Sequence, residues 1–277
     1  MSIIYGLKDS DRYIYHYTKP DKAIEYILRN KTLLLNSFAR TNDPKESKDW
    51  RLTPWTTNPL PSNDFLDESL PKVIASKLKL PIHLACFCTD APDLSGSHLD
   101  DILLRGLARP RMWAQYAQDH EGFCLVFDKE KILSQMRQQF SKNSFLFGLV
   151  SYKDRSFVTS LEPNAFRLEF DKLQELGTEA YVRAHMLTYF KELYFEKLED
   201  WRDEREWRVL MLDHYGEPPL IDIRESLVSV IHGASTSVED SGRAVSLTSE
   251  LGITHTRLYW INHSPWYDLG SVPWSHA

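Results

Sequence analysis

The sequence predicts a mixed α+β fold made of one domain. Segments with the alternating polarity of strands are interspersed with segments of helical spacing, and several neighbours resemble hairpins rather than regular βαβ units. The chain has 277 residues, of which 42% are hydrophobic, so it is long enough to bury a sizeable core. Because no linker rich in glycine, serine or proline divides it, we expect a single domain over residues 1–277.

Strands are expected where β-branched and aromatic residues alternate with polar ones. The first such run is residues 12–18, and Pro20 ends it. Apolar runs bounded by turn residues predict further strands at residues 32–36, 82–88, 122–128, 145–152, 205–212, 226–232 and 255–261. After the second strand, Asp43 and Pro44 predict a turn, since Asp bonds its own backbone and Pro restricts φ.

Helices are expected where apolar residues recur every three or four positions. This spacing predicts helices at residues 21–30, 62–80, 111–120, 129–140, 164–197 and 237–251. Pro71 is expected to kink or break the second helix, and Gly122 to stop the third. The chain then consists of a core at about residues 12–232, helical insertions at about 62–80 and 162–200, and a strand–helix–strand unit with a Trp-rich tail at about 233–277.

Composition excludes several classes of protein. The formal net charge of -6 argues against non-specific wrapping of DNA, which relies on neutralising phosphates. No run of about 18 apolar residues spans a membrane, and residues 1–11 lack the apolar core of a secretory signal. The three cysteines form no even-numbered disulfide framework, so we expect a cytoplasmic protein.

No metal site is expected. Cys86, Cys88 and Cys124 lie in apolar runs, where a free cysteine behaves as a small hydrophobic residue. A zinc site would need a fourth ligand, such as His83, and a different spacing.

Two candidate site residues lie at the end of a strand and on a short helix. His16 is near the end of the first strand, where sheets present side chains to ligands, and the alternative is an ordinary core or edge histidine. Tyr116 shares a predicted helix with Met112 and Trp113, and this aromatic face suits either a ligand or the core.

A third candidate, Glu206, opens an otherwise apolar strand. Burying a carboxylate there is unfavourable without hydrogen bonds, and the alternative interpretation is a salt bridge to Arg205 or Arg208. Glu204 and Glu206 flank Arg205 with strand spacing, so both carboxylates are expected on one face.

Three short motifs resemble an uncharacterised bacterial family, domain of unknown function 2971. They are Asn-Asp-Pro-Lys-Glu at residues 42–46, Met-Trp-Ala-Gln-Tyr-Ala at 112–117 with His-Glu-Gly at 120–122, and Glu-Arg-Glu-Trp-Arg at 204–208. The resemblance runs from about Tyr13 to the turn at Gly233 and names no activity. It makes Asn42 a secondary candidate for the site.

The order of elements bearing His-x-Thr, Phe, Tyr and Glu also resembles, more distantly, the ADP-ribosyltransferase fold in its His-Tyr-Glu branch. This resemblance implies a mainly antiparallel split sheet with flanking helices, and NAD as the substrate. His16 would bond the ribose of the nicotinamide half, with the Tyr17 backbone and Thr18 beside the nicotinamide amide. Tyr116 would stack on the nicotinamide ring, and Glu206 would be the catalytic carboxylate.

The chain departs from that branch at two places. Tyr17 stands where the polymerases of the branch have glycine, and residues 90–110 lengthen the spacing between Phe87 and Tyr116. The chemistry nevertheless suits these residue types. Cleavage of the nicotinamide–ribose bond passes through an oxocarbenium-like state, which a carboxylate stabilises, while an aromatic ring holds the charged pyridinium.

A basic cluster of Arg105, Arg109 and Arg111 precedes the Tyr116 helix. Arginine forks match phosphate oxygens, so these residues are candidates for the NAD pyrophosphate or a nucleic-acid acceptor, and a solvated loop is the alternative. In arginine-modifying transferases a second carboxylate holds the ribose hydroxyl and the acceptor, which makes Glu204 a secondary candidate.

The resemblance implies an ADP-ribosyltransferase or NAD glycohydrolase, in the setting of a bacterial toxin or phage-defence effector. The acceptor is open among protein, nucleic acid, small molecule and water, and an antitoxin or other protein partner is possible in such a setting. The first alternative is a non-catalytic module that binds a nucleotide, a nucleic acid or a protein. The second is a metal-independent nuclease or RNA-processing enzyme that uses His16 and His120.

Overall fold

The computed structural model describes residues 11–59, 67–97, 100–141, 144–155, 164–212 and 214–267. The strands are β1 Tyr13–Thr18, β2 Thr32–Leu34, β3 Asn36–Ser37, β4 Thr53–Trp55, β5 His83–Thr89, β6 Phe123–Asp128, β7 Phe145–Leu149, β8 Ser151–Tyr152, β9 Arg167–Glu169, β10 Glu196–Lys197, β11 Glu206–Met211, β12 Leu220–Asp222, β13 Leu227–His232, β14 Thr254–Ile261 and β15 Ser264–Tyr267.

The helical elements are shorter and more divided than the strands. The α-helices are α2 Pro20–Lys22, α3 Pro44–Ser47, α4 Leu70–Lys79, α5 Pro110–Tyr116, α6 Lys129–Gln139, α8 Phe170–Leu176, α9 Thr178–Thr188, α10 Phe190–Tyr194 and α11 Val238–Thr248. A π-helical segment, η1 Ala23–Leu28, continues α2. Short 3-10 segments are η2 Phe38–Arg40, η4 Ile102–Leu104, η5 Gly106–Ala108, η6 Asn164–Phe166, η7 Glu199–Glu204 and η8 Ser249–Leu251.

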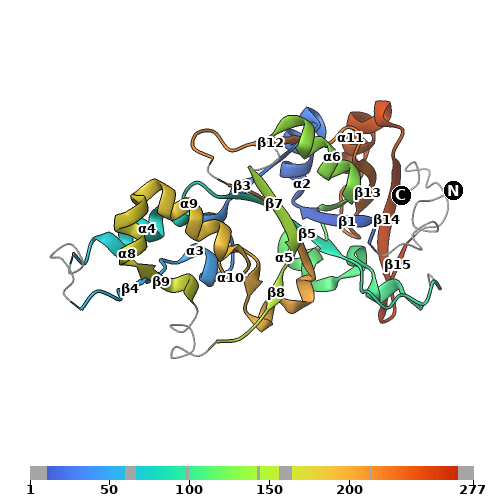
Figure 1. Cartoon of the computed structure of the whole chain (residues 1–277). Helices are drawn as coiled ribbons and strands as arrows, with labels where there is room; N and C mark the ends of the chain where they lie inside the picture. The colour runs from blue at the N-terminus through green and yellow to red at the C-terminus, as the bar shows by residue number, and fades with distance from the viewer. Residues whose placement is uncertain are drawn as a thin grey trace.

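One large sheet of nine strands forms the centre of the molecule (Figure 1). Its order is β15-β14-β13-β6-β1-β5-β11-β7, and β3 also pairs with β5. Its neighbouring strands are antiparallel, except that β13 and β14 are parallel. Helices flank this sheet, so the expected mixed α+β fold with a mainly antiparallel sheet is confirmed.

The sheet opens between β1 and β5. These strands pair at only two positions, Ile14 with Thr89 and Tyr15 with Cys88, and they then separate. At its other end β5 pairs with the short strand β3, through His83 and Leu84. The middle of β5 therefore borders a gap, and this gap forms the candidate site described below.

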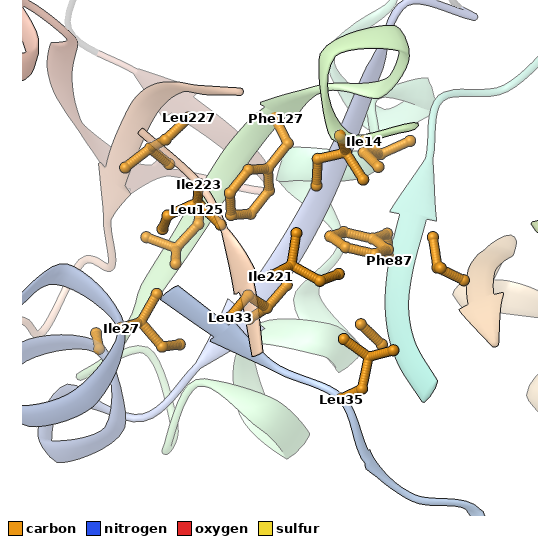
Figure 2. Close-up of a cluster of buried hydrophobic side chains, with 14 of the residues drawn as sticks. Ile14, Ile27, Leu33, Leu35, Phe87, Leu125, Phe127, Ile221, Ile223 and Leu227 are labelled. Atoms are coloured by element: carbon orange, nitrogen blue, oxygen red, sulfur yellow. The ribbon is translucent and has the colours of Figure 1, made fainter. Parts of the chain in front are cut away.

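The two faces of the sheet carry separate apolar clusters, as the alternation along β1 requires. Ile14 lies in the cluster beneath η1, α6 and α11, whose core Figure 2 shows around Phe87, Leu125 and Phe127. Tyr13, Tyr15 and Tyr17 share the opposite face, where they pack against residues of η4, η5 and α5. His16 follows the Ile14 side of the strand, and its ring centroid lies 5.7 Å from that of Phe87.

A third cluster lies in the helix-rich part at the left of Figure 1. It joins α4, which packs on α9, with α8, α10 and one face of β5 and β11. The predicted insertions at residues 62–80 and 162–200 supply its helices. The structure does not test whether these insertions form part of one domain, so the single domain stays a prediction.

The single long helix expected at residues 164–197 is wrong. Three helices, α8, α9 and α10, occupy this stretch, with β9 before them and β10 after them. The break between α8 and α9 lies at Gly177, whose φ of 75° is a conformation that glycine adopts at little steric cost. Spacing alone missed this break because apolar residues recur with helical period on both sides of it.

Several other helices and strands differ from the prediction at their ends. The helix at 111–120 ends as α5 at Tyr116, because Gln118, Asp119 and His120 have positive φ and leave the helical path. Segment 32–36 divides into β2 and β3, segment 145–152 into β7 and β8, and the helix at 237–251 into α11 and η8. Pro71 lies in the first turn of α4, where a missing N–H costs nothing, so it causes no kink within this helix.

Some predicted segments lie wholly or partly outside the described residues. Residues 62–66 of the predicted second helix and residues 268–277 of the Trp-rich tail are among them. Within the described part of that tail, residues 264–267 form β15, which the sequence did not indicate.

A buried polar network joins β13, β14 and α11, and it predicts acid sensitivity. His232 Nε2 lies 2.9 Å from His255 Nδ1, and His255 Nε2 lies 2.9 Å from Thr248 Oγ1. Burial lowers the pKa of His255 from 6.5 to about 4, and burial together with the neighbouring His255 and Arg257 lowers the pKa of His232. Both imidazoles are therefore neutral at pH 7 in the folded protein.

The unfolded chain binds protons on these histidines more readily than the folded protein does, so acid favours unfolding. We expect the free energy of unfolding to fall as the pH decreases from about 6.5 towards 4. The variant His255→Gln should lose less stability than the wild type between pH 7 and pH 5 in urea unfolding. The exposed His263, changed to Gln, is the control and should keep the wild-type pH dependence. Parallel pH profiles for His255→Gln and the wild type would contradict this prediction.

Candidate functional site

A pocket of about 430 Å³ lies at the gap between β1 and β5. Its wall includes the middle of β5 from Leu84 to Cys88, the end of β1 and one face of α5. The side chains of His16, Tyr116 and Glu206, which come from three separate segments, all line it. Its volume falls in the range of small-molecule sites, roughly 300–1,000 Å³.

His16 spans the gap in the sheet. Its Nδ1 lies 2.9 Å from the backbone oxygen of Cys86 on β5, which has no β1 backbone partner at this position. Burial lowers the pKa of His16, although the Cys86 bond acts in the opposite direction. A carbonyl only accepts, so in the neutral ring the proton belongs on Nδ1, and Nε2 is left as an acceptor for a ligand hydroxyl.

The acidic side of the pocket is a chain of short contacts. The Tyr116 hydroxyl donates to Glu204 Oε1 at 2.6 Å, and Lys197 Nζ lies 2.8 Å from Glu204 Oε2. The same Nζ lies 2.6 Å from Glu206 Oε2. Glu204 ends η7 just before β11, and Arg205 between them has a φ of 42°, so the expected strand spacing is wrong. The two carboxylates still converge, because both bind Lys197.

A second ion pair holds the other carboxylate oxygen of Glu206. Arg208 Nε donates to Glu206 Oε1 at 2.6 Å, and Arg208 Nη1 donates to Glu46 Oε1 at 2.6 Å. Glu46 lies in α3, which Asp43 caps by accepting from the Lys45 backbone N–H at 2.9 Å, with Pro44 in the first turn. The salt bridge to Arg208 that the sequence offered as an alternative for Glu206 is thus present, and it is buried: Arg208 is 0% exposed and Glu206 2%.

The environments of the two pocket carboxylates shift their pKa values in opposite directions. Burial raises the pKa of Glu206, but the charges and hydrogen bonds of Arg208 and Lys197 outweigh it and bring the pKa to about 2. Burial raises the pKa of Glu204, and the neighbouring Glu206 adds to this, against the opposing effect of Lys197. Glu206 is therefore ionised at all ordinary pH values, whereas Glu204 holds a proton more readily. Opposed pKa values in neighbouring carboxyl groups are typical of acid–base sites.

Tyr116 is held by hydrogen bonds rather than free. Burial and the neighbouring Glu204 raise the pKa of its phenol, so it stays protonated and donates to that carboxylate. Asn42, a secondary candidate from the sequence, lines the same pocket. Its side chain forms a hydrogen bond with Tyr116 that lowers the pKa of the phenol, against the larger effect of burial.

Of the remaining aromatic and hydroxyl candidates, one lines the pocket and two do not. Tyr17 lines the pocket, and its hydroxyl donates to the backbone oxygen of Gly106 at 2.6 Å. Thr18 is buried outside the pocket lining. Trp113 is fully buried, and its indole N–H donates to the Leu107 carbonyl at 2.8 Å, so it serves the core.

The basic cluster of Arg105, Arg109 and Arg111 lies outside the lining of this pocket. Arg105 forms a buried ion pair with Asp90 at 2.9 Å. Arg111 donates to the Asp200 carbonyl at 2.8 Å, and its guanidinium carbon lies 5.6 Å from the centre of the Trp201 ring. Arg109 has two buried guanidinium nitrogens without a hydrogen-bond partner among the described residues. The three arginines thus have separate surroundings.

Sequence reasoning missed Lys197 and the second buried partner of Arg208, which organise the acidic side. Lys197 comes at the end of a stretch interpreted as helix, and no pattern marks it. Arg208 carried a usable signal, because a guanidinium in the middle of an apolar strand needs a buried partner. The partner itself, Glu46, is 162 positions away in the chain.

Two further absences concern metals and membranes. Among the described residues, no group of three or more His, Cys, Asp or Glu side chains is arranged to hold a metal ion. In the same part of the chain, every helix is too short or too polar to cross a lipid bilayer. His120, the second histidine of the nuclease alternative, stacks on Trp113 and lies outside the pocket lining, so His16 and His120 do not share this pocket.

Comparison with known proteins shows that part of the chain is similar to one family. Residues 112–209 match the model of a family described as "Protein of unknown function (DUF2971)". The match runs from α5 to β11, so the resemblance to this uncharacterised family is confirmed over a shorter stretch than the sequence motifs indicated. It includes Tyr116, Glu204 and Glu206 but not His16. No curated protein and no solved structure matches the chain, and the resemblance to ADP-ribosyltransferases stays a prediction.

Proposed function

We propose that the pocket between β1 and β5 binds NAD and cleaves its nicotinamide–ribose bond, as an NAD glycohydrolase or an ADP-ribosyltransferase. The observation that carries the proposal is that His16, Tyr116, Glu204 and Glu206 line one pocket. A histidine, an aromatic ring and a carboxylate are the groups that the resemblance implies for this reaction, and Glu204 adds a second carboxylate.

Glu206 supplies the electrostatic part of the proposed reaction. When the C–N bond to nicotinamide breaks, its electron pair passes to the pyridinium nitrogen, and positive charge develops on the ribose. A carboxylate with a pKa of about 2 is ionised throughout the reaction and stabilises this charge. Lys197 and Arg208 hold the carboxylate in place, so little reorganisation is needed.

Glu204 and His16 have complementary roles in the proposal. The incoming water or acceptor hydroxyl forms the new bond to the ribose carbon, and its proton passes to Glu204, whose raised pKa suits it to accept one. His16 Nε2 accepts a hydrogen bond from a ribose hydroxyl and orients the sugar. The Tyr116 ring lies against the pyridinium, with a cation–π contribution. A toxin or phage-defence setting for this reaction rests on the family resemblance alone.

One observation favours a second function, a binding module without turnover. Glu206 is 2% exposed and has two cationic partners, which is also what a purely structural ion-pair network looks like. In that case the same pocket binds a nucleotide and leaves it intact.

Incubation of the purified protein with NAD separates these functions. We expect the protein to release more than one equivalent of nicotinamide, and chromatography measures the amount released. NADH is the matched control, because its uncharged ring is a poor leaving group and should remain attached. Calorimetric binding of NAD without nicotinamide release would favour the binding module. If the protein shows no NAD binding and no nicotinamide release, both functions are refuted.

A further inference from the structure

The pocket at the β1–β5 gap is lined by side chains of both charges. Glu204 and Glu206 belong to the lining, and so do Lys19 and Arg40. Because the chain as a whole carries a formal net charge of -6, an anionic ligand is attracted only where cations gather locally. Lys19 and Arg40 provide such a place within the pocket.

The backbone positions of Lys19 and Arg40 are fixed by the segments to which they belong. Lys19 follows β1 directly and adopts an extended conformation before Pro20, and its carbonyl accepts the Ala23 N–H at 3.0 Å. Arg40 is the last residue of η2, a segment anchored by Phe38, which is fully buried. Each side chain therefore leaves a well-packed segment and lines the pocket from an exposed position.

Both cations are available to a ligand. Within the part of the chain that the structure describes, neither Lys19 nor Arg40 forms an ion pair with a carboxylate. Lys197, the remaining lysine or arginine of the lining, instead forms ion pairs with Glu204 and Glu206. Lys19 and Arg40 are thus the lining residues with positive charge to offer.

The arginines that the sequence singled out for this role are placed elsewhere. Arg105 is neutralised by Asp90, and Arg111 binds the Asp200 carbonyl and Trp201. Arg109 also lies outside the pocket lining, whereas the segments after β1 and β3 contribute Lys19 and Arg40 to it.

We infer that Lys19 and Arg40 bind the diphosphate of a dinucleotide whose nicotinamide half lies between His16, Tyr116 and Glu206. This inference rests on the proposed function and names the part of the substrate that the cations recognise. Arginine presents a fork that matches two phosphate oxygens, while lysine acts as a point charge. The site thereby discriminates in favour of ligands with a diphosphate and against the bare nicotinamide nucleoside.

The test is calorimetric titration of the full chain with ADP and with inorganic pyrophosphate. The double variant Lys19→Gln, Arg40→Gln should bind ADP at least about 10-fold more weakly than the wild type, since it loses two charge-assisted contacts. The matched control is Lys22→Gln, Arg29→Gln. It removes the same charge from exposed positions outside the pocket lining and should bind ADP within about 2-fold of the wild type.

The outcomes separate this inference from the proposed function. If the wild type releases no nicotinamide from NAD but ADP binding depends on Lys19 and Arg40, the diphosphate site stands and the catalytic proposal fails. If nicotinamide is released but the double variant binds ADP as tightly as the wild type does, the diphosphate inference is overturned and the proposed function stands. Absence of ADP binding to the wild type also overturns it. Pyrophosphate binding as tight as that of ADP would show a general anion site and overturn the dinucleotide assignment.

Discussion

Glu206→Gln is expected to reduce nicotinamide release from NAD by a factor of 100 or more. The amide keeps the shape of the side chain and removes the charge that stabilises the developing cation, a loss that typically costs about 10²–10³ in rate. Because the pKa of Glu206 is about 2, the wild-type carboxylate is ionised at every pH of the assay. Release by the wild type should accordingly show no acid limb from this residue above about pH 4.

The matched control for this substitution is Glu130→Gln on α6, an exposed glutamate away from the pocket. It should release nicotinamide at the wild-type rate. Circular dichroism must show that Glu206→Gln is folded, since the amide leaves Lys197 and Arg208 with Glu204 and Glu46 as their remaining carboxylate partners. A folded Glu206→Gln protein with undiminished release would exclude Glu206 from catalysis.

Arg208→Met should destabilise the fold by about 3–5 kcal/mol. The guanidinium is fully buried and binds Glu46, Glu206 and the Tyr194 carbonyl, so its loss leaves a buried carboxylate at Glu46 without its ion-pair partner. Removing one member of a buried pair is far more harmful than removing both. Urea unfolding followed by circular dichroism measures the effect.

Two further variants define the origin of that destabilisation. Adding Glu46→Gln to Arg208→Met should recover part of the lost stability, because the unpaired charge is then gone. Arg224→Met removes an arginine that is 65% exposed and pairs with Asp222, and it should change stability by less than about 1 kcal/mol. If Arg208→Met is no more destabilising than Arg224→Met, the buried network does not support the fold.

Much of the sheet was predictable because local alternation reports burial. The segments of β5, β6, β11 and β13 were predicted to within a residue or two, since their apolar runs are short and bounded by turn residues. The residues 164–197 were misinterpreted because helical spacing persists across Gly177, where the chain changes direction. The short strands β4, β9, β10 and β12 carry too few residues for any period to show.

The candidate site likewise contains residues that the sequence indicated and residues that it did not. His16, Tyr116 and Glu206 were noticed in the sequence as polar groups at the ends of elements, and the resemblance to ADP-ribosyltransferases made them, with Glu204, candidates for the site. Lys19 and Arg40 were not identified, because an exposed cation beside a turn looks like any solvated side chain.

The sequence by itself determined the class of fold, the first strand and the polar groups at the ends of its elements. All of these follow from the local pattern of apolar and polar residues, which decides what each segment must bury. Only the tertiary structure decided that β1 and β5 separate, that Lys197 joins Glu204 to Glu206, and that Arg208 meets Glu46. The reason is physical: the partner of a buried charge is chosen by proximity in the folded chain, and a distance of 162 positions leaves no periodic trace.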